Sequence, residues 1–135
     1  MGTQIDWKAL AKHAWLARKS AYAPYSKFAV GAALLAESGD IFTGCNVENV
    51  SLGLTICAER VAVSTAVRGG CRKFAGIAGV AETESPVMPC GACRQFLAEF
   101  EPSLPLYSEG AAGVHISYSL SALLPSPFVG TVIGQ

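Results

Sequence analysis

Apolar residues recur at helical spacing between residues 5 and 22, while lysines and arginines fall on the opposite side of the same segment. This pattern predicts an amphipathic helix, which ends where Pro24 interrupts it. Residues 27–36 and 41–47 are two mostly apolar runs separated by the turn sequence Glu-Ser-Gly-Asp. Two such runs on either side of a turn predict a β-hairpin.

The second half of the chain predicts two longer helices and three strands. Helical patterns cover residues 57–67 and 90–100, and a pair of glycines follows the first of them. Residues 74–81 form a continuous apolar run, which is typical of a buried strand. Two short strands are expected at 104–107 and 114–118, on either side of a glycine-rich turn. A last helical turn at 119–124 precedes a tail that begins at Pro125.

This order of elements predicts an α/β fold. Strand–helix–strand units imply parallel pairing with helices on both faces of the sheet, and the hairpin adds an antiparallel pair. We therefore expect a three-layer α/β/α sandwich on a mixed sheet of about five strands. A chain of 135 residues is long enough for one core, so residues 1–135 are expected to form a single domain.

Composition excludes two classes of partner. Ten basic residues balance ten acidic ones and no lysine or arginine run exceeds two, so no positive surface for nucleic acid is expected. No apolar run approaches the roughly 20 residues that span a membrane, and residues 1–12 lack the hydrophobic region of a signal peptide. Because 51% of the residues are hydrophobic and only 15% are charged, we expect surface that is buried between subunits.

Three of the five cysteines lie in two short motifs that zinc chemistry uses. The motifs are Cys57-Ala58-Glu59 and Pro89-Cys90-Gly91-Ala92-Cys93, in which each first cysteine stands near a predicted helix start. A helix N-terminus favours the thiolate that zinc requires, so we expect Cys57, Cys90 and Cys93 to hold one Zn²⁺ per chain. Three protein ligands leave a fourth position open for water, as in catalytic zinc sites.

Glu59 and two arginines complete this predicted site. Glu59 lies roughly 200° around the helix from Cys57, which favours a proton-transfer role beside the metal over ligation. Arg60 lies three residues after Cys57 and Arg94 lies four after Cys90, so each guanidinium is expected to donate to its own thiolate. We assign Gln95 to the same supporting group.

The other two cysteines have no such motif. Cys45 and Cys71 are expected to be small buried hydrophobic residues, and an odd number of cysteines argues against a disulfide framework. Reduced thiols fit the cytoplasm. An alternative is a structural zinc module with Cys45 or Cys71 as fourth ligand, but that alternative leaves Glu59 and both arginines unexplained.

Cys-x-Glu followed by Pro-Cys-x-x-Cys is the signature of zinc deaminases. With residues 20–28, 44–49 and 123–125, the chain resembles cytidine deaminase of the small homotetrameric kind. The resemblance implies hydrolytic deamination of cytidine and 2′-deoxycytidine, with Glu59 serving as both base and acid. It also implies a homo-oligomer, expected to be a tetramer, with sites shared between subunits.

The resemblance assigns substrate contacts to residues outside the zinc motifs. Asn46 and Glu48, which alone would be interpreted as turn residues, resemble the pair that binds the ribose hydroxyls. Phe28 resembles the aromatic beside the pyrimidine, and Ala58 resembles a backbone contact. Phe128, which could otherwise cap its own core, resembles an aromatic delivered from a neighbouring subunit.

One residue at the expected rim of the substrate pocket leaves a second enzymatic function open. Leu52 stands where many relatives carry a tyrosine, which bears on substrate preference. A blasticidin S deaminase-like protein shares both zinc motifs and is the alternative. The pair Asn46 and Glu48, together with Phe28, favours plain nucleosides.

Overall fold

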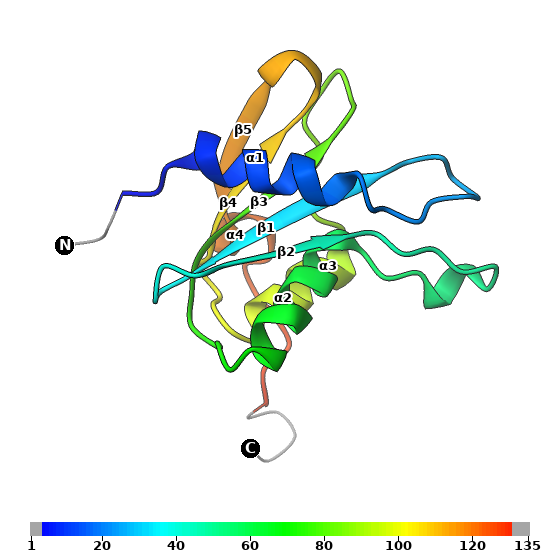
Figure 1. The fold of residues 1–135 in the computed structure, drawn as a ribbon. Helices are drawn as coiled ribbons and strands as arrows, with labels where there is room; N and C mark the ends of the chain where they lie inside the picture. Colours follow the sequence, from blue (N-terminus) through cyan, green and yellow to red (C-terminus); the bar gives the residue numbers. More distant parts are fainter. Residues whose placement is uncertain (1–3, 131–135) are drawn as a thin grey trace.

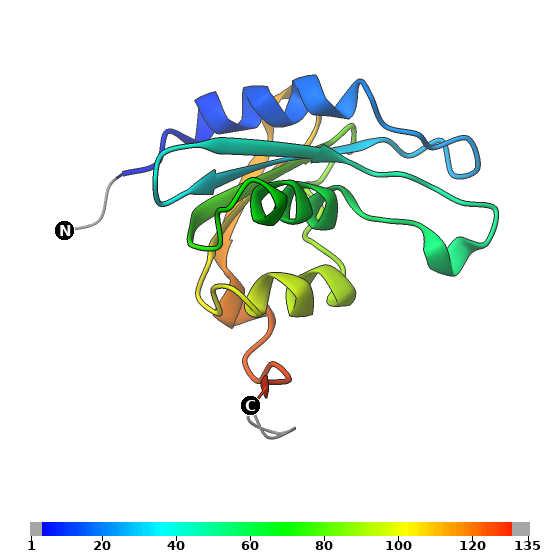
Figure 2. The same cartoon turned by 60° about the horizontal axis from the view of Figure 1, so that its bottom comes forward.

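A computed structural model describes residues 4–130 and contains a five-stranded mixed sheet with helices on both faces (Figures 1 and 2). The helical elements are α1 (Trp7–Arg18), η1 (Leu52–Leu54), α2 (Ala58–Arg68), α3 (Gly91–Ala98), η2 (Ala111–Gly113) and α4 (Leu120–Leu123). The strands are β1 (Val30–Ala36), β2 (Ile41–Cys45), β3 (Phe74–Ala81), β4 (Pro105–Glu109) and β5 (His115–Ser119). Among the described residues, no helix is long and apolar enough to cross a membrane.

The strands lie in the order β2-β1-β3-β4-β5. β3 and β4 pair in parallel through the connection that contains α3, and the other neighbouring pairs are antiparallel. Helix α1 covers one face, while α2 and α3 lie on the other (Figure 2). This arrangement confirms the three-layer sandwich and the mixed five-stranded sheet that the sequence predicts.

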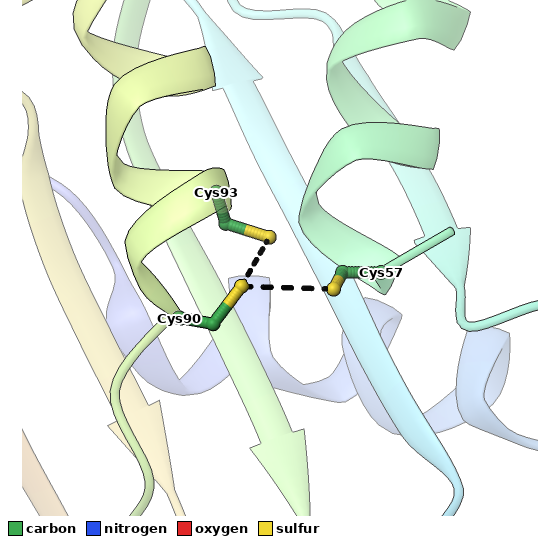
Figure 3. A group of neighbouring side chains, drawn as sticks. All are labelled: Cys57, Cys90 and Cys93. Atoms are coloured by element: carbon green, nitrogen blue, oxygen red, sulfur yellow. Dashed lines mark hydrogen bonds between the residues drawn. The ribbon is translucent and has the colours of Figure 1, made fainter. Parts of the chain in front are cut away.

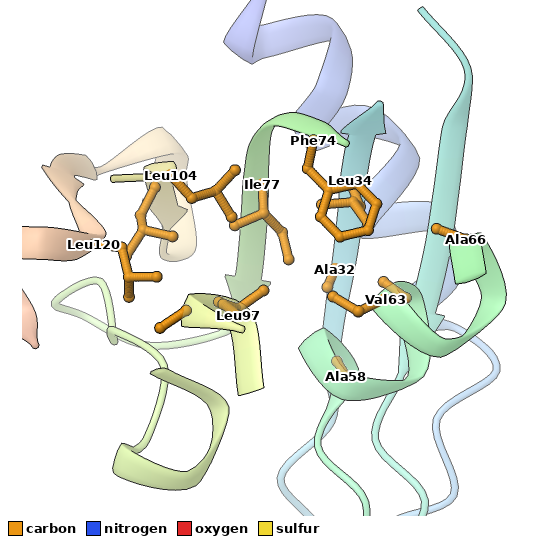
Figure 4. Packing of buried hydrophobic residues seen from close by; sticks show 13 residues of the cluster. Ala32, Leu34, Ala58, Val63, Ala66, Phe74, Ile77, Leu97, Leu104 and Leu120 are labelled. Carbon is orange, nitrogen blue, oxygen red and sulfur yellow. The ribbon is translucent and has the colours of Figure 1, made fainter. Parts of the chain in front are cut away.

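The larger core cluster lies between the sheet and helices α2 and α3. Leu34 of β1 and Ile77 of β3 pack there with Val63 and Leu97 from the two helices (Figure 4). The smaller cluster, under α1, consists of Leu10, Ala11, Ala14, Ala33, Ala78, Val80 and Tyr107. Successive residues of β1 and β3 alternate between the two clusters, as the two-residue period of a strand requires.

Two glycines let the helices lie directly on the sheet. A Cβ atom at Gly31 would stand 2.0 Å from the carbonyl oxygen of Ala14 in α1. A Cβ at Gly44 would stand 2.5 Å from the carbonyl oxygen of Ala58, in the first turn of α2. Because Gly44 brings the β2 backbone this close, the start of α2 has a fixed height above the sheet.

The structure shortens several predicted elements. Helix α1 ends at Arg18 instead of Tyr22, and β1 begins at Val30 instead of residue 27. The residues between them form a loop whose backbone is bound by side chains of the segment after β2. Cys57 and Cys90 are N-cap residues with extended backbone, and each helix begins one residue later than predicted.

Candidate active site

The three cysteines of the two motifs meet at the N-termini of α2 and α3 (Figure 3). The Sγ of Cys90 lies 3.8 Å from that of Cys57 and 3.5 Å from that of Cys93, and all three sulfurs lie within 4.8 Å of one another. A tetrahedral zinc with Zn–S bonds of about 2.3 Å separates its sulfur ligands by about 3.8 Å. The sulfur cluster therefore has the dimensions that one zinc ion requires.

Hydrogen bonds and charge favour thiolate in this cluster. The Nη2 atom of Arg60 lies 3.6 Å from the Sγ of Cys57 and also donates to the carbonyl of Thr55. A hydrogen bond with Cys93, supported by Arg60, lowers the pKa of Cys57 to about 5. The same contact between the two cysteines raises the pKa of Cys93, and a bound dication favours the loss of that remaining proton.

Glu59 stands beside the sulfur cluster without joining it. It is the second residue of α2, it is only 9% exposed, and its Oε1 lies 3.7 Å from the Sγ of Cys93. Its other oxygen lies over Gly79 of β3, 3.6 Å from where a Cβ would be. Burial raises the pKa of the Glu59 carboxyl. A carboxyl with a raised pKa, close to a metal site, suits both uptake and return of a proton.

The contact predicted for Arg60 is present, but the one predicted for Arg94 is not. The Nε of Arg94 donates to the carbonyl of Pro89 at 2.8 Å, and its Nη1 donates to the carbonyl of Leu123 at 3.2 Å. These two bonds direct the guanidinium to backbone carbonyls instead of to the Cys90 thiolate. Arg94 thus links the residue before Cys90 to the end of α4 through two hydrogen bonds.

Gln95 also binds the C-terminal segment instead of the sulfur cluster. Its side-chain amide donates to the carbonyl of Phe128 at 2.9 Å and accepts from the N–H of Phe128 at 3.0 Å. The Phe128 ring is 58% exposed, so it does not cap the core of its own chain. The amide of Gln95 therefore holds the backbone of Phe128 and leaves its ring at the surface.

Asn46 holds the loop that carries Phe28. Its Oδ1 accepts from the N–H of Val30 and its Nδ2 donates to the carbonyl of Phe28, both at 2.8 Å. Asn46 is 7% exposed, while the Phe28 side chain is 41% exposed. A buried amide thus fixes the backbone on both sides of Ala29 and leaves the neighbouring ring accessible.

Glu48 holds the preceding part of the same loop. Its Oε1 accepts from the N–H groups of Tyr25 and Ser26, at 3.0 and 3.1 Å, and the Ser26 hydroxyl donates to its other oxygen. That hydroxyl contact is the main cause of the lowered pKa of Glu48. The residues themselves give no local signal of these loop contacts, because the partners are about 20 positions apart.

The remaining residues singled out from the sequence lie on different elements. Ala58, fully buried, is the first residue of α2, directly after Cys57. Leu52 lies in η1, 74% exposed, on a segment that projects from the body of the molecule (Figure 1). Cys45 and Cys71 are only partly buried, which corrects the expectation of buried small hydrophobes.

Comparison with known proteins supports zinc binding by the sulfur cluster. The family model for the cytidine and deoxycytidylate deaminase zinc-binding region matches residues 5–107. Cytidine deaminase of Sporosarcina psychrophila is 50% identical over 125 residues, which are 92% of each chain. The chain belongs to the cytidine and deoxycytidylate deaminase family. Cytidine deaminase of Halalkalibacterium halodurans is 47% identical over 92% of this chain and 95% of its own.

Solved structures of this family share the fold. Cytidine deaminase from Burkholderia pseudomallei superimposes with a TM-score of 0.89 at 47% identity, over 92% of this chain and all of its own. The enzyme from Mycobacterium tuberculosis gives a TM-score of 0.82 at 42% identity, over 93% and 99% of the two chains. The family model, residues 5–107, includes the three cysteines of the sulfur cluster and Glu59.

The sequence analysis did not single out Ser108, which lies beside Glu59 in the structure. Ser108 is buried in β4 and lines a small cavity together with Glu59, Val87 and Pro89. The signal was topological: the end of β4 lies beside β3 in a parallel pair, and ligands of α/β folds gather at such ends. Serine in a short strand carries no motif of its own.

Proposed function

We propose that this protein is a zinc-dependent deaminase that hydrolyses cytidine and 2′-deoxycytidine to the uridines and ammonia. The observation that carries the proposal is the buried carboxylate of Glu59 beside three converging sulfurs. The names of the relatives support the substrate class. A structural Cys₄ module would need a fourth sulfur, whereas Cys57, Cys90 and Cys93 form the whole cluster found in residues 4–130.

Glu59 performs the proton transfers of the proposed reaction. Zinc held by Cys57, Cys90 and Cys93 would bind a water in its open position and lower the pKa of that water to about 7. Glu59 takes a proton from the attacking water as a C–O bond forms at C4 of the pyrimidine. It gives this proton to N3. It then takes the proton of the new C4 hydroxyl and passes it to the amine, so that the C–N bond breaks as the C4 carbonyl forms and ammonia leaves.

The loop 25–29 and the residues that hold it form the proposed nucleoside subsite. Phe28 offers its exposed ring to the pyrimidine, and the backbone of Ala58 lies next to Cys57. An ionised carboxylate accepts up to about four hydrogen bonds, so Glu48 can accept a ribose hydroxyl while still holding the loop. The lowered pKa of Glu48 keeps it ionised at neutral pH. Asn46 is proposed as its partner at the ribose.

We propose that the protein forms a homo-oligomer, in particular a tetramer. The segment between β2 and α2 exposes Val50 (75%), Leu52 (74%) and Leu54 (66%), and Figure 2 shows it extending away from the sheet. A single chain leaves this apolar surface in water, which favours a second copy. Phe128, held by Gln95 with its ring exposed, is proposed to enter a neighbouring active site.

A spectroscopic assay tests the reaction. Purified protein should remove the ultraviolet absorbance of cytidine, and metal analysis should give about one zinc per chain. Activity on blasticidin S without activity on either nucleoside would favour the alternative enzyme. Zinc bound by four sulfurs, or two zinc ions per chain, would exclude the open site. Light scattering tests the tetramer.

The cytoplasm is the proposed location. The five cysteines, all within residues 4–130, form no disulfide. Reduced thiols persist in the cytoplasm, whereas oxidising compartments promote their pairing. Fractionation of the source cells, with detection of the chain by antibody, tests this assignment.

A further inference from the structure

Four polar side chains are buried in the part of the chain that the structure describes: Asn46, Glu48, Glu59 and Ser108. The proposed function uses the first three. Ser108 is 3% exposed, and nothing in the zinc chemistry or the nucleoside subsite requires it. A buried hydroxyl needs a hydrogen-bond partner, and the identity of that partner shows what the side chain does.

The partner of Ser108 is the segment that leads into the zinc helix. Its Oγ donates to the carbonyl oxygen of Val87 at 2.5 Å, 21 positions away in the chain. Val87 belongs to the loop between β3 and α3 and lies three residues before Cys90. Strand β4 thus holds, through one side chain, a segment that has no helix or strand structure of its own.

The same hydroxyl lies close to Glu59. Ser108 pairs in register with Gly79 of β3, the residue beneath the Glu59 carboxylate. Glu59, Val87 and Ser108 line one cavity of about 10 Å³, which is room for about one water molecule. The bond between Ser108 and Val87 therefore fixes a wall of the space around the Glu59 carboxylate.

A second side chain holds the other end of this wall. The Nε of Arg94 binds the carbonyl of Pro89 at 2.8 Å, so the carbonyls on both sides of Met88 are each bound by a side chain. Arg94 comes from α3, which carries Cys93, whereas Ser108 comes from the sheet. The two bonds hold different parts of the segment. Arg94 holds Pro89, which is next to Cys90, and Ser108 holds Val87, which lines the cavity with Glu59.

We propose that Ser108 is a positioning residue for the deamination, which acts through the Val87 carbonyl to keep residues 87–89 against the carboxylate of Glu59. The proposal rests on the deaminase function proposed above. Removal of the hydroxyl leaves a carbonyl without its donor and enlarges a cavity that already has room for a water. The wall then moves or takes up water, and Glu59 loses its dry, fixed surroundings while the three sulfurs keep theirs.

The test compares Ser108→Ala with Ser108→Thr, which restores a hydroxyl, in the full-length zinc-loaded enzyme. Ser108→Ala should lower kcat about tenfold, the effect of one buried hydrogen bond, with KM within about twofold and about one zinc per chain. Ser108→Thr should recover most of kcat. Hydrogen exchange at the amides of Val87 and Met88 should be faster in Ser108→Ala than in wild type.

Two control variants separate positioning from general stability. Ser117→Ala removes an exposed hydroxyl from β5 and should match wild type. Leu10→Ala creates a cavity on the opposite face of the sheet, so it should lower the thermal midpoint without changing kcat or the exchange at residues 87 and 88. If Ser108→Ala does not fold, Ser108→Cys, which keeps a weak donor of similar size, replaces it with the same expected direction.

The results that overturn the proposal are distinct from those that overturn the function. Wild-type protein with one zinc and no activity on either nucleoside refutes the proposed function, and with it any role of Ser108 in the reaction. Active wild type with unchanged kcat in Ser108→Ala refutes the positioning role alone. Failure of Ser108→Thr to recover activity, or an equal loss of kcat in Leu10→Ala, refutes it as well.

Discussion

Glu59 has little water around its carboxylate, so its few protein neighbours decide its chemistry. Burial raises the pKa of the carboxyl, and the Cys93 thiol, whose Sγ lies 3.7 Å from Oε1 of Glu59, is its hydrogen-bond donor. The carboxylate lies outside the group of three sulfurs that fits one metal ion. These surroundings support the proposed role of Glu59 as a proton-transfer group and not a ligand.

Replacing Glu59 tests that separation of roles. Glu59→Gln keeps the shape of the side chain but cannot exchange a proton, so activity should fall by at least about 10²- to 10⁴-fold. Zinc content, measured by atomic absorption, should stay at wild-type level. Loss of zinc from the variant would show that Glu59 is a ligand.

The two arginines near the sulfur cluster should behave differently from each other. Arg60 donates to the Cys57 sulfur, so Arg60→Ala should weaken zinc binding by about 10- to 100-fold. Arg94 binds the carbonyls of Pro89 and Leu123, so Arg94→Ala should loosen the C-terminal segment and make it more sensitive to protease. Zinc transfer to a chromogenic chelator and limited proteolysis measure the two effects. Equal zinc affinity in wild type and Arg60→Ala would contradict the role of that hydrogen bond.

At the scale of elements, the sequence predicts what has a repeating pattern or a spaced motif. The apolar periodicity predicts the helices and strands, and the spacing of Cys57, Cys90 and Cys93 predicts the sulfur cluster. The pattern does not predict that both leading cysteines are N-caps, because a cap is defined by backbone conformation. It also misassigns Arg94 and Gln95. Leu123 and Phe128, two of their partners, lie more than 25 residues further along the chain, and the third partner is the backbone carbonyl of Pro89, which carries no periodic signal.

The height of α2 above the sheet depends on one glycine. In Gly44→Ala the new methyl would meet the backbone of Ala58 and Ala62, each at 2.5 Å, so α2 must move. Overpacking of this kind costs about 1–3 kcal/mol, and the thermal midpoint should fall accordingly. Gly91→Ala is the control, because its methyl has no neighbour within 4 Å and alanine favours a helix. Equal midpoints for the two variants would contradict the close packing of β2 and α2.

At the scale of the whole molecule, part of the high apolar content lies on the surface. Composition yields only the total, 51% hydrophobic, whereas the structure shows that the most exposed apolar side chains, Val50 and Leu52, lie on the segment after β2, with others spread over α1, β5 and the C-terminal segment. No local pattern separates an apolar residue of the core from one at a subunit interface. The overall fold was therefore predictable from the sequence pattern, whereas the position of the surface proposed to join copies of the chain was not.

A mixing experiment tests whether Phe128 serves another chain. Glu59→Gln chains lack the proton-transfer group but keep Phe128, and Phe128→Ala chains do the reverse. Co-refolded oligomers should contain sites with an intact Glu59 and a Phe128 from a neighbour, so activity should exceed the sum of the two parents. The double variant Glu59→Gln/Phe128→Ala, refolded alone, is the control. Absence of recovery in proven mixed oligomers would place Phe128 outside the neighbouring site.

The closeness of the three sulfurs also makes the protein vulnerable to air. Sulfurs 3.5 and 3.8 Å apart need to approach by less than about 2 Å to reach the length of a disulfide bond. The lowered pKa of Cys57 supplies a thiolate at neutral pH, the form that oxidants attack. Dissolved oxygen can take up the two electrons that pairing releases, and the metal protects the thiolates for as long as it is bound.

Chelated protein that is stored in air should therefore lose its capacity to take zinc back. We expect two free thiols fewer per chain by titration with a thiol reagent, and recovery of zinc binding after treatment with dithiothreitol. Zinc-loaded protein kept in the same buffer should retain all its thiols. Full zinc uptake by the aerated, chelated protein without reductant would show that the sulfurs cannot pair, so preparation of the apoprotein would need no protection from oxygen.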